Sequence, residues 1–182
     1  ASMILHEEVK ERLDEIEKIV IETQEASVRI IDKIGPLDSP ADRDHCLQYM
    51  IAVPLILGRL TAADYEADVA ADPRINALRD KMEVKENESF TKDYSNPEKR
   101  YIGNALQVFF KDGSSTLRVR VDYPIGHRQR RKEGIPILIR KFEASISPKL
   151  KAVQWKNLKA LCRNQEGLAG TAVDDFMSLL VA

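Results

Sequence analysis

The chain has 182 residues, 43% of them hydrophobic and 31% charged, which is the composition of one globular domain or one and a half small ones, and excludes a disordered chain. Lysine and arginine total 28 against 29 acidic residues, so no overall field draws the chain to nucleic acid or anionic lipid. No apolar run approaches the length of a membrane span, so neither a membrane nor a nucleic acid is an expected partner.

The first third of the chain predicts a helix, a strand and a second helix. Apolar residues recur at helical spacing between charged ones over residues 2–16, which predicts an amphipathic helix. Residues 19–23 are β-branched and predict a buried strand. Residues 25–34 predict a short helix that Gly35-Pro36 closes. Because the chain begins without methionine and inside the first helix, we expect a fragment or a processed chain.

A mostly apolar helix predicted over residues 40–54 carries unusual polar side chains. Asp42 is its predicted N-cap, because a carboxylate there accepts from the amides of the first turn. His45 and Tyr49 are four residues apart and are therefore expected on one face, where they can line a polar pocket. The alternative is a core tyrosine with one satisfied hydroxyl and a surface histidine near the cap.

The middle of the chain gives two helix signals and one loop. Thr61 with Asp64 three residues later fits a capping box. A proline opens the helix predicted over residues 73–79. Residues 86–100 are polar and predict a loop.

Apolar and polar residues alternate on both sides of Asp112-Gly113, which predicts a hairpin over residues 104–123. Helices are expected over residues 135–146 and then, after a proline, over 153–163 and 173–181. The predicted class is α+β, with a small, partly antiparallel sheet and helices packed on one face.

No motif in the sequence calls for a metal, a nucleotide or a cluster. The three histidines stand apart, and the sequence has no glycine-rich phosphate loop. Cys46 and Cys162 have no metal-ligand spacing around them, so free thiols in a reducing cytoplasm are expected. The basic run 126–132 is open to three interpretations: a solvated loop, a carboxylate or interface site, or a nucleic-acid contact.

Two segments together resemble the MmgE/PrpD family. The first begins PADRDHCLQYMIAVP at residue 40 and continues to Glu66. The second is YPIGHRQRRKEGIP, residues 123–136, followed by Lys141-Phe142. The segments keep their order and approximate spacing, and the resemblance covers nearly the whole chain.

The resemblance implies a two-domain protein with its active site between a large helical domain and a smaller α+β domain. Residues 1–147 would belong to the smaller domain, whose N-terminal part is missing, and residues 148–182 would be helices that return to the helical one. The implied reaction is dehydration of 2-methylcitrate to 2-methylaconitate without a metal or any other cofactor. A homodimer in the cytoplasm, or in the mitochondrial matrix of a eukaryote, is implied as well.

The resemblance assigns Tyr49 a catalytic role and makes Arg43 and His45 candidates for binding the tricarboxylate substrate. The elimination needs a base, an acid and cations for the carboxylates. The family's lysine and histidine of the smaller domain match no residue here, so this chain alone is expected to be inactive. Asp44 and Cys46 stand where distant relatives often carry a basic residue and a serine.

Two alternatives remain open at this point. One is a related tricarboxylate lyase or isomerase. The other, of a different class, is a non-catalytic dimerisation or interaction module. Turnover of 2-methylcitrate separates the catalytic and non-catalytic interpretations.

Overall fold

The computed structural model describes residues 1–181 and confirms the α+β class. The chain divides into two compact units, one covering Ala1–Pro124 and the other starting at Ile125. The sequence placed the domain boundary of the full-length family protein at residues 147–148, and that assignment stays a prediction.

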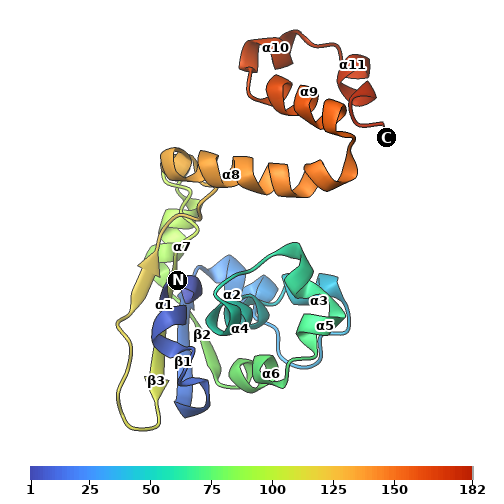
Figure 1. Cartoon of the computed structure of the whole chain (residues 1–182). Coiled ribbons are helices and arrows are strands. Elements are labelled where there is room, and N and C mark those ends of the chain that lie inside the picture. Colours follow the sequence, from blue (N-terminus) through green and yellow to red (C-terminus); the bar gives the residue numbers. More distant parts are fainter. Residues whose placement is uncertain (182) are drawn as a thin grey trace. The chain divides into compact units, whose positions relative to one another are not determined.

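The first unit is built on a four-stranded mixed sheet in the order β2-β1-β3-β4 (Figure 1). Its strands are β1 Ile16–Thr23, β2 Met82–Glu86, β3 Asn104–Phe110 and β4 Val119–Val121. β1 runs parallel to β2 and antiparallel to β3, and β3 runs antiparallel to β4. The predicted strand at residues 19–23 and the predicted hairpin are therefore confirmed, with a shorter second hairpin strand.

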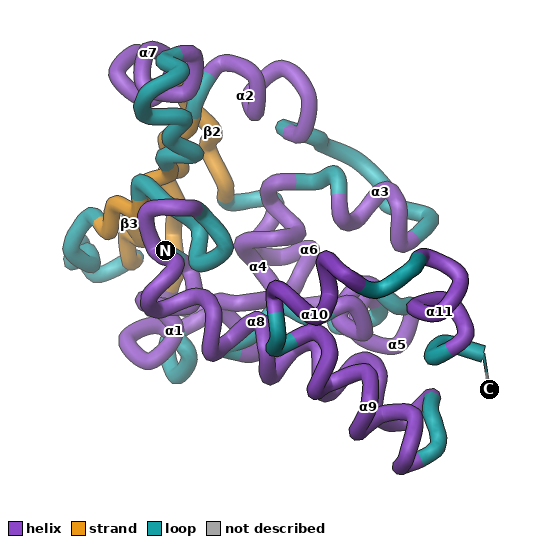
Figure 2. Tube along the Cα trace, turned by 90° about the horizontal axis from the view of Figure 1, so that it is seen from above, coloured by secondary structure: helices purple, strands orange, loops and turns teal. Residues whose placement is uncertain are grey.

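One face of the sheet forms the core of this unit. Because side chains alternate along a strand, Ile19 and Ile21 of β1 point to the same face, where they meet Leu106 and Val108 of β3. Helices α1 (Ser2–Val9), α4 (Leu47–Leu57) and α6 (Pro73–Arg79) cover this face, as Figure 2 shows from above. The predicted helix 73–79 is confirmed, as is the packing of helices on one face.

The first helix is shorter than predicted. α1 ends at Val9, and a 3-10 turn at Leu13–Glu15 leads into β1, so Ile16 belongs to the strand. Ile16 is buried in the core from the strand, and its apolar character therefore fitted the helical pattern by coincidence. The following helix, α2, spans Glu25–Ile31 and confirms the predicted short helix with an earlier end.

The predicted helix over residues 40–54 consists of two helices, α3 (Pro40–Asp44) and α4. The N-cap is Ser39 and not Asp42, which lies at the third helical position and completes a capping box with Ser39. Cys46 is extended between the helices, and its buried thiol lies 3.6 Å from the carbonyl oxygen of Lys33. The helix is therefore interrupted at Cys46, where the side chain contacts the segment around Lys33, and helical periodicity does not reveal this interruption.

The polar segment 86–100, predicted as a loop, contains helix α7 (Glu88–Ser95). Asn87 is its N-cap, with its side-chain oxygen accepting from the Ser89 amide at 3.1 Å. Phe90 is the only buried residue of this mostly polar helix, and it was the polar composition of the segment that predicted a loop. β2 was also missed, since it is an edge strand of only five residues, in which the alternation of apolar and charged side chains is brief.

The Thr61 capping box is confirmed and opens a 3-10 helix, Ala62–Tyr65, followed by α5 (Ala67–Ala70). The hairpin turn is confirmed at Gly113, whose φ of +84° is a conformation that glycine adopts without strain. Among residues 1–181 no helix is long and apolar enough to cross a membrane.

The second unit is helical. It contains α8 (Arg131–Ile146), α9 (Ala152–Cys162), α10 (Gln165–Gly170) and α11 (Val173–Ser178). α8 begins four residues before the predicted start, and α10 was not predicted. Of its described residues only Gly134 and Leu158 are buried, while large apolar side chains are exposed on every helix from α8 to α11.

Candidate functional site

A cavity of about 520 Å³ in the first unit brings together two arginines and Tyr49. Its walls come from the loop at residues 35–38 and from α3, α4 and the α5–α6 region. The volume lies in the range of small-ligand sites. Its polar lining residues are Asp38, Arg43, Tyr49, Asn76, Arg79 and Asp80.

Tyr49 lies on α4 with only 2% of its surface exposed. Its hydroxyl donates to the backbone carbonyl of Asp64 at 2.7 Å, and its ring stacks on Tyr65 with centroids 5.9 Å apart. Burial raises the pKa of Tyr49 above its usual value, so the phenol is neutral at pH 7. The hydroxyl therefore has one proton, which is held by Asp64, and lone pairs that can accept.

The side chain of Asp64 is held by its own hydrogen bonds, which fix the position of the backbone carbonyl that accepts from Tyr49. Its buried carboxylate accepts from the Thr61 amide at 2.7 Å and from Arg59 Nη2 at 3.0 Å. Burial by itself raises the pKa of Asp64, but the hydrogen bonds from Thr61 and Arg59 outweigh it and hold the pKa below its usual value. The capping box thus keeps the side chain of Asp64 ionised, and the backbone carbonyl of the same residue accepts from Tyr49.

Arg43 lies on α3 and is 8% exposed. Its Nη1 donates to the carbonyl of Tyr65 at 2.7 Å, and no carboxylate among residues 1–181 lies within ion-pair distance of it. A buried guanidinium without a counter-ion is costly. An anion in the cavity would reduce that cost.

Arg79, at the end of α6, is a cavity residue that sequence reasoning missed. Its Nη1 donates to Asn76 Oδ1 at 2.7 Å and its Nη2 to the carbonyl of Gly35 at 2.8 Å. Its Nε is buried and has no hydrogen-bond partner among the described residues. A cation in the last turn of a helix is common, so the sequence carried no signal that this one lines a cavity.

Asp38 and Asp80 also line the cavity, but both are exposed. Solvent screens exposed charges far more than it screens a buried guanidinium. The inner part of the cavity, around Arg43, is therefore its positive part.

His45 does not join this site. It lies at the break between α3 and α4, with 63% of its side chain exposed, and its Nδ1 lies 2.5 Å from the Asp44 carboxylate. The prediction that His45 and Tyr49 share a helix face is wrong, because the helix is interrupted between them. Its substrate-binding role stays a prediction without a place in the cavity.

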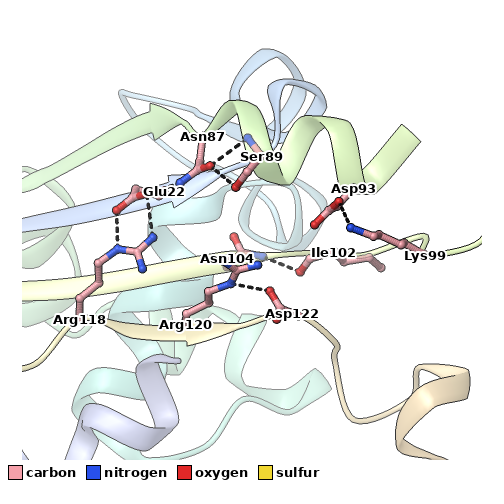
Figure 3. Close-up of polar contacts among 10 residues, drawn as sticks. All are labelled: Glu22, Asn87, Ser89, Asp93, Lys99, Ile102, Asn104, Arg118, Arg120 and Asp122. Carbon is pink, nitrogen blue, oxygen red and sulfur yellow. Dashed lines mark hydrogen bonds and ion pairs between the residues drawn. The ribbon is translucent and has the colours of Figure 1, made fainter. Parts of the chain in front are cut away.

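A second polar cluster, at one end of the sheet, differs from the cavity in its charge balance (Figure 3). Arg118 pairs with Glu22 at 2.6 Å, Arg120 with Asp122 at 2.7 Å and Lys99 with Asp93 at 2.6 Å. Each of these cations has its own carboxylate. Arg118, the residue before β4, joins that end of the strand to β1, and Lys99 joins the segment after α7 to that helix, so these three cations are already paired within the protein.

The remaining candidates from the sequence do not add a site. Within the described part of the chain no three histidine, cysteine or acidic residues are grouped as a metal site. The basic run 126–132 lies at the start of the second unit, where Arg130 pairs with Glu133 at 2.7 Å. Its three interpretations remain open.

The fold and the cavity define an α+β domain in which two guanidinium groups, neither of them paired with a carboxylate of residues 1–181, line a cavity with a buried tyrosine. Comparison with known proteins places this domain in a family. The MmgE/PrpD C-terminal domain model matches residues 1–166. The chain belongs to the MmgE/PrpD family, as the two sequence segments predicted.

Several curated relatives carry the name 2-methylcitrate dehydratase. The mitochondrial protein of Yarrowia lipolytica is 48% identical over the whole chain, which covers 35% of that relative. The protein of Salmonella typhimurium is 49% identical over the whole chain, which covers 38% of its length. The probable 2-methylcitrate dehydratase of Saccharomyces cerevisiae is 55% identical over 72% of the chain and 26% of its own length. The chain thus spans about a third of these relatives and corresponds to their C-terminal part.

Proposed function

We propose that the chain is the C-terminal part of a hydro-lyase that converts 2-methylcitrate to 2-methylaconitate. The names of its relatives support this substrate. The observation that carries the proposal is the cavity that Arg43, Arg79 and Tyr49 line together, where neither arginine pairs with a carboxylate of residues 1–181. Three carboxylates are the distinctive feature of the substrate, and unpaired guanidinium groups are the side chains that bind carboxylates most strongly.

In this proposal the chain supplies binding and orientation. Arg43 is the primary carboxylate ligand, since its guanidinium is buried and no carboxylate of residues 1–181 already pairs with it. Tyr49 orients the substrate through its hydroxyl in one of two ways. It keeps its bond to the Asp64 carbonyl and accepts from the substrate hydroxyl, or it turns and donates to a substrate carboxylate. The proton-abstracting base and the acid for the departing hydroxyl come from the upstream part of the protein.

The finer properties that the resemblance implies belong to the same proposal. The whole protein is a homodimer, and it works in the cytoplasm or, in a eukaryote, in the mitochondrial matrix. The name of the Yarrowia lipolytica relative, which calls that protein mitochondrial, supports the second location. The residues from 148 onward pack on the helical domain, which agrees with the apolar side chains exposed on α9 to α11.

The alternative is a non-catalytic interaction module, and the same exposed apolar side chains favour it. Incubation with 2-methylcitrate separates the two, with the ultraviolet absorbance of the unsaturated product as the readout. We expect turnover by the full-length protein and none by residues 1–182 alone. A full-length protein that folds and dimerises but leaves 2-methylcitrate unchanged would favour the module. Turnover of a different tricarboxylate would indicate the related lyase or isomerase.

A further inference from the structure

Arg79 has features that a helix-terminal arginine does not need. Two of its nitrogens are fixed by protein acceptors, Asn76 Oδ1 and the Gly35 carbonyl, so the plane of its guanidinium is set before any ligand arrives. The third nitrogen, Nε, is buried with no acceptor among the described residues. Because Nε is closed to solvent, a ligand meets the outer nitrogens instead: Nη1 and Nη2 each have a second N–H that can donate to a carboxylate oxygen in the cavity.

The same cavity holds Arg43, which is also without an acidic partner among residues 1–181. A single carboxylate needs one guanidinium, because one planar fork already matches both of its oxygens. Two guanidinium groups held by different helices, α3 and α6, fit a ligand with at least two carboxylates. A cavity of about 520 Å³ has room for such a ligand.

We propose that Arg79 is a specificity-determining residue that binds one carboxylate of the substrate while Arg43 binds another. This inference rests on the proposed function for the identity of the substrate, and it adds the reason why a polycarboxylate is selected. Arg79 also connects the ligand to the loop at residues 35–38 through Gly35. A bound carboxylate therefore stabilises the loop wall of the cavity.

The test uses the full-length protein and tricarballylate, which has three carboxylates and no hydroxyl to eliminate. Its affinity is measured by calorimetry for the unsubstituted protein and for Arg79→Gln, Arg79→Lys and Arg74→Gln. Arg74 is the matched control, since it lies on the same helix but is exposed and paired with Asp72 at 2.6 Å. We expect Arg79→Gln to weaken binding about 10- to 100-fold, the range for losing a hydrogen bond to a charged group. Arg79→Lys restores part of the loss, and Arg74→Gln changes little.

A second measurement needs no substitution and therefore does not depend on the variants folding. Phenylglyoxal modifies accessible arginines, and peptide mass spectrometry reads each of them separately. Saturating tricarballylate is expected to protect Arg79, which is partly exposed, but not Arg74. Unchanged labelling of Arg79, unchanged affinity in a folded Arg79→Gln protein, or no binding of tricarballylate at all would overturn the inference.

The two proposals fail in different ways. If tricarballylate protects Arg79 but 2-methylcitrate is not turned over, the carboxylate site stands and the proposed reaction is wrong. If 2-methylcitrate is turned over and Arg79→Gln retains the KM of the unsubstituted protein, the reaction stands and Arg79 only anchors the loop.

Discussion

At the scale of single residues, Tyr49 shows that a side chain can satisfy two descriptions at once. Its burial and its bond to the Asp64 carbonyl are what a core tyrosine requires. Its position on the wall of a cavity with Arg43 and Arg79 is what a substrate-orienting tyrosine requires. Stability and activity of one variant separate these roles.

Tyr49→Phe removes only the hydroxyl. Because the Asp64 carbonyl loses its donor, we expect a loss of unfolding free energy of about 0.5–1.5 kcal/mol in urea unfolding. If the hydroxyl also contacts substrate, kcat/KM of the full-length protein falls by about 10- to 1000-fold, the range for losing one such donor. Tyr65→Phe, which removes the hydroxyl of the stacked ring, is the control. Full activity with reduced stability would show that Tyr49 is only a core residue.

At the scale of elements, Gly58 ends α4 in a conformation that no other residue there adopts easily. Its φ is +67°, and an added Cβ would lie 2.8 Å from the ring of His6, which bonds the Leu55 carbonyl at 2.9 Å. Gly113 in the hairpin turn has φ +84° and open space around it. Substitution of Gly113 by alanine therefore tests backbone strain alone, whereas the same substitution at Gly58 adds steric overlap.

We expect Gly113→Ala to cost about 1–2 kcal/mol, which is the left-handed strain alone. Gly58→Ala should cost more than about 2 kcal/mol, because the overlap with His6 adds to the same strain. Urea unfolding of both variants measures the difference. Equal losses would mean that α1 moves freely away from α4.

The capping box that begins at Thr61 should make stability depend on pH. The pKa of Asp64 is lowered in the folded chain, so its ionised form adds stability above the unfolded pKa of about 3.9, and this is lost as pH falls from there through the folded pKa. Asp64→Asn should cost about 1–3 kcal/mol at pH 7 and less at pH 3. Asp68→Asn changes an exposed carboxylate and should have little effect at either pH. A loss for Asp64→Asn that does not vary with pH would contradict this.

At the scale of the whole molecule, the two units differ in how much core they have. Residues 1–124 enclose an apolar cluster between the sheet and its helices, whereas the described residues of the second unit have almost no buried side chains. Hydrogen exchange in this chain alone should therefore be slow in β1 and β3 and fast over residues 153–181. In the full-length protein the same helices should become protected. Strong protection of them in the chain alone would contradict their packing on another domain.

Much of the fold was predictable because local pattern and final burial agree. The alternation around Asp112-Gly113 gave the hairpin, and the proline at residue 73 gave the start of α6, since these signals depend on neighbouring residues only. α7 and β2 were missed, because the polar composition of α7 predicted a loop and β2, with five residues, is too short for its alternation to stand out. The two sequence segments at residues 40 and 123 were sufficient for the family, which the match over residues 1–166 confirms.

The candidate site depended on the tertiary structure. The sequence by itself determined the α+β class and the family, and it made Arg43, His45 and Tyr49 candidates for the site. The break at Cys46 removed His45 from Tyr49, and the packing of α6 brought Arg79 to the cavity from thirty residues away along the chain. Helical periodicity describes neighbours three or four residues apart. Which distant charges share a cavity, and which of them lack a counter-ion, is decided only when the helices pack.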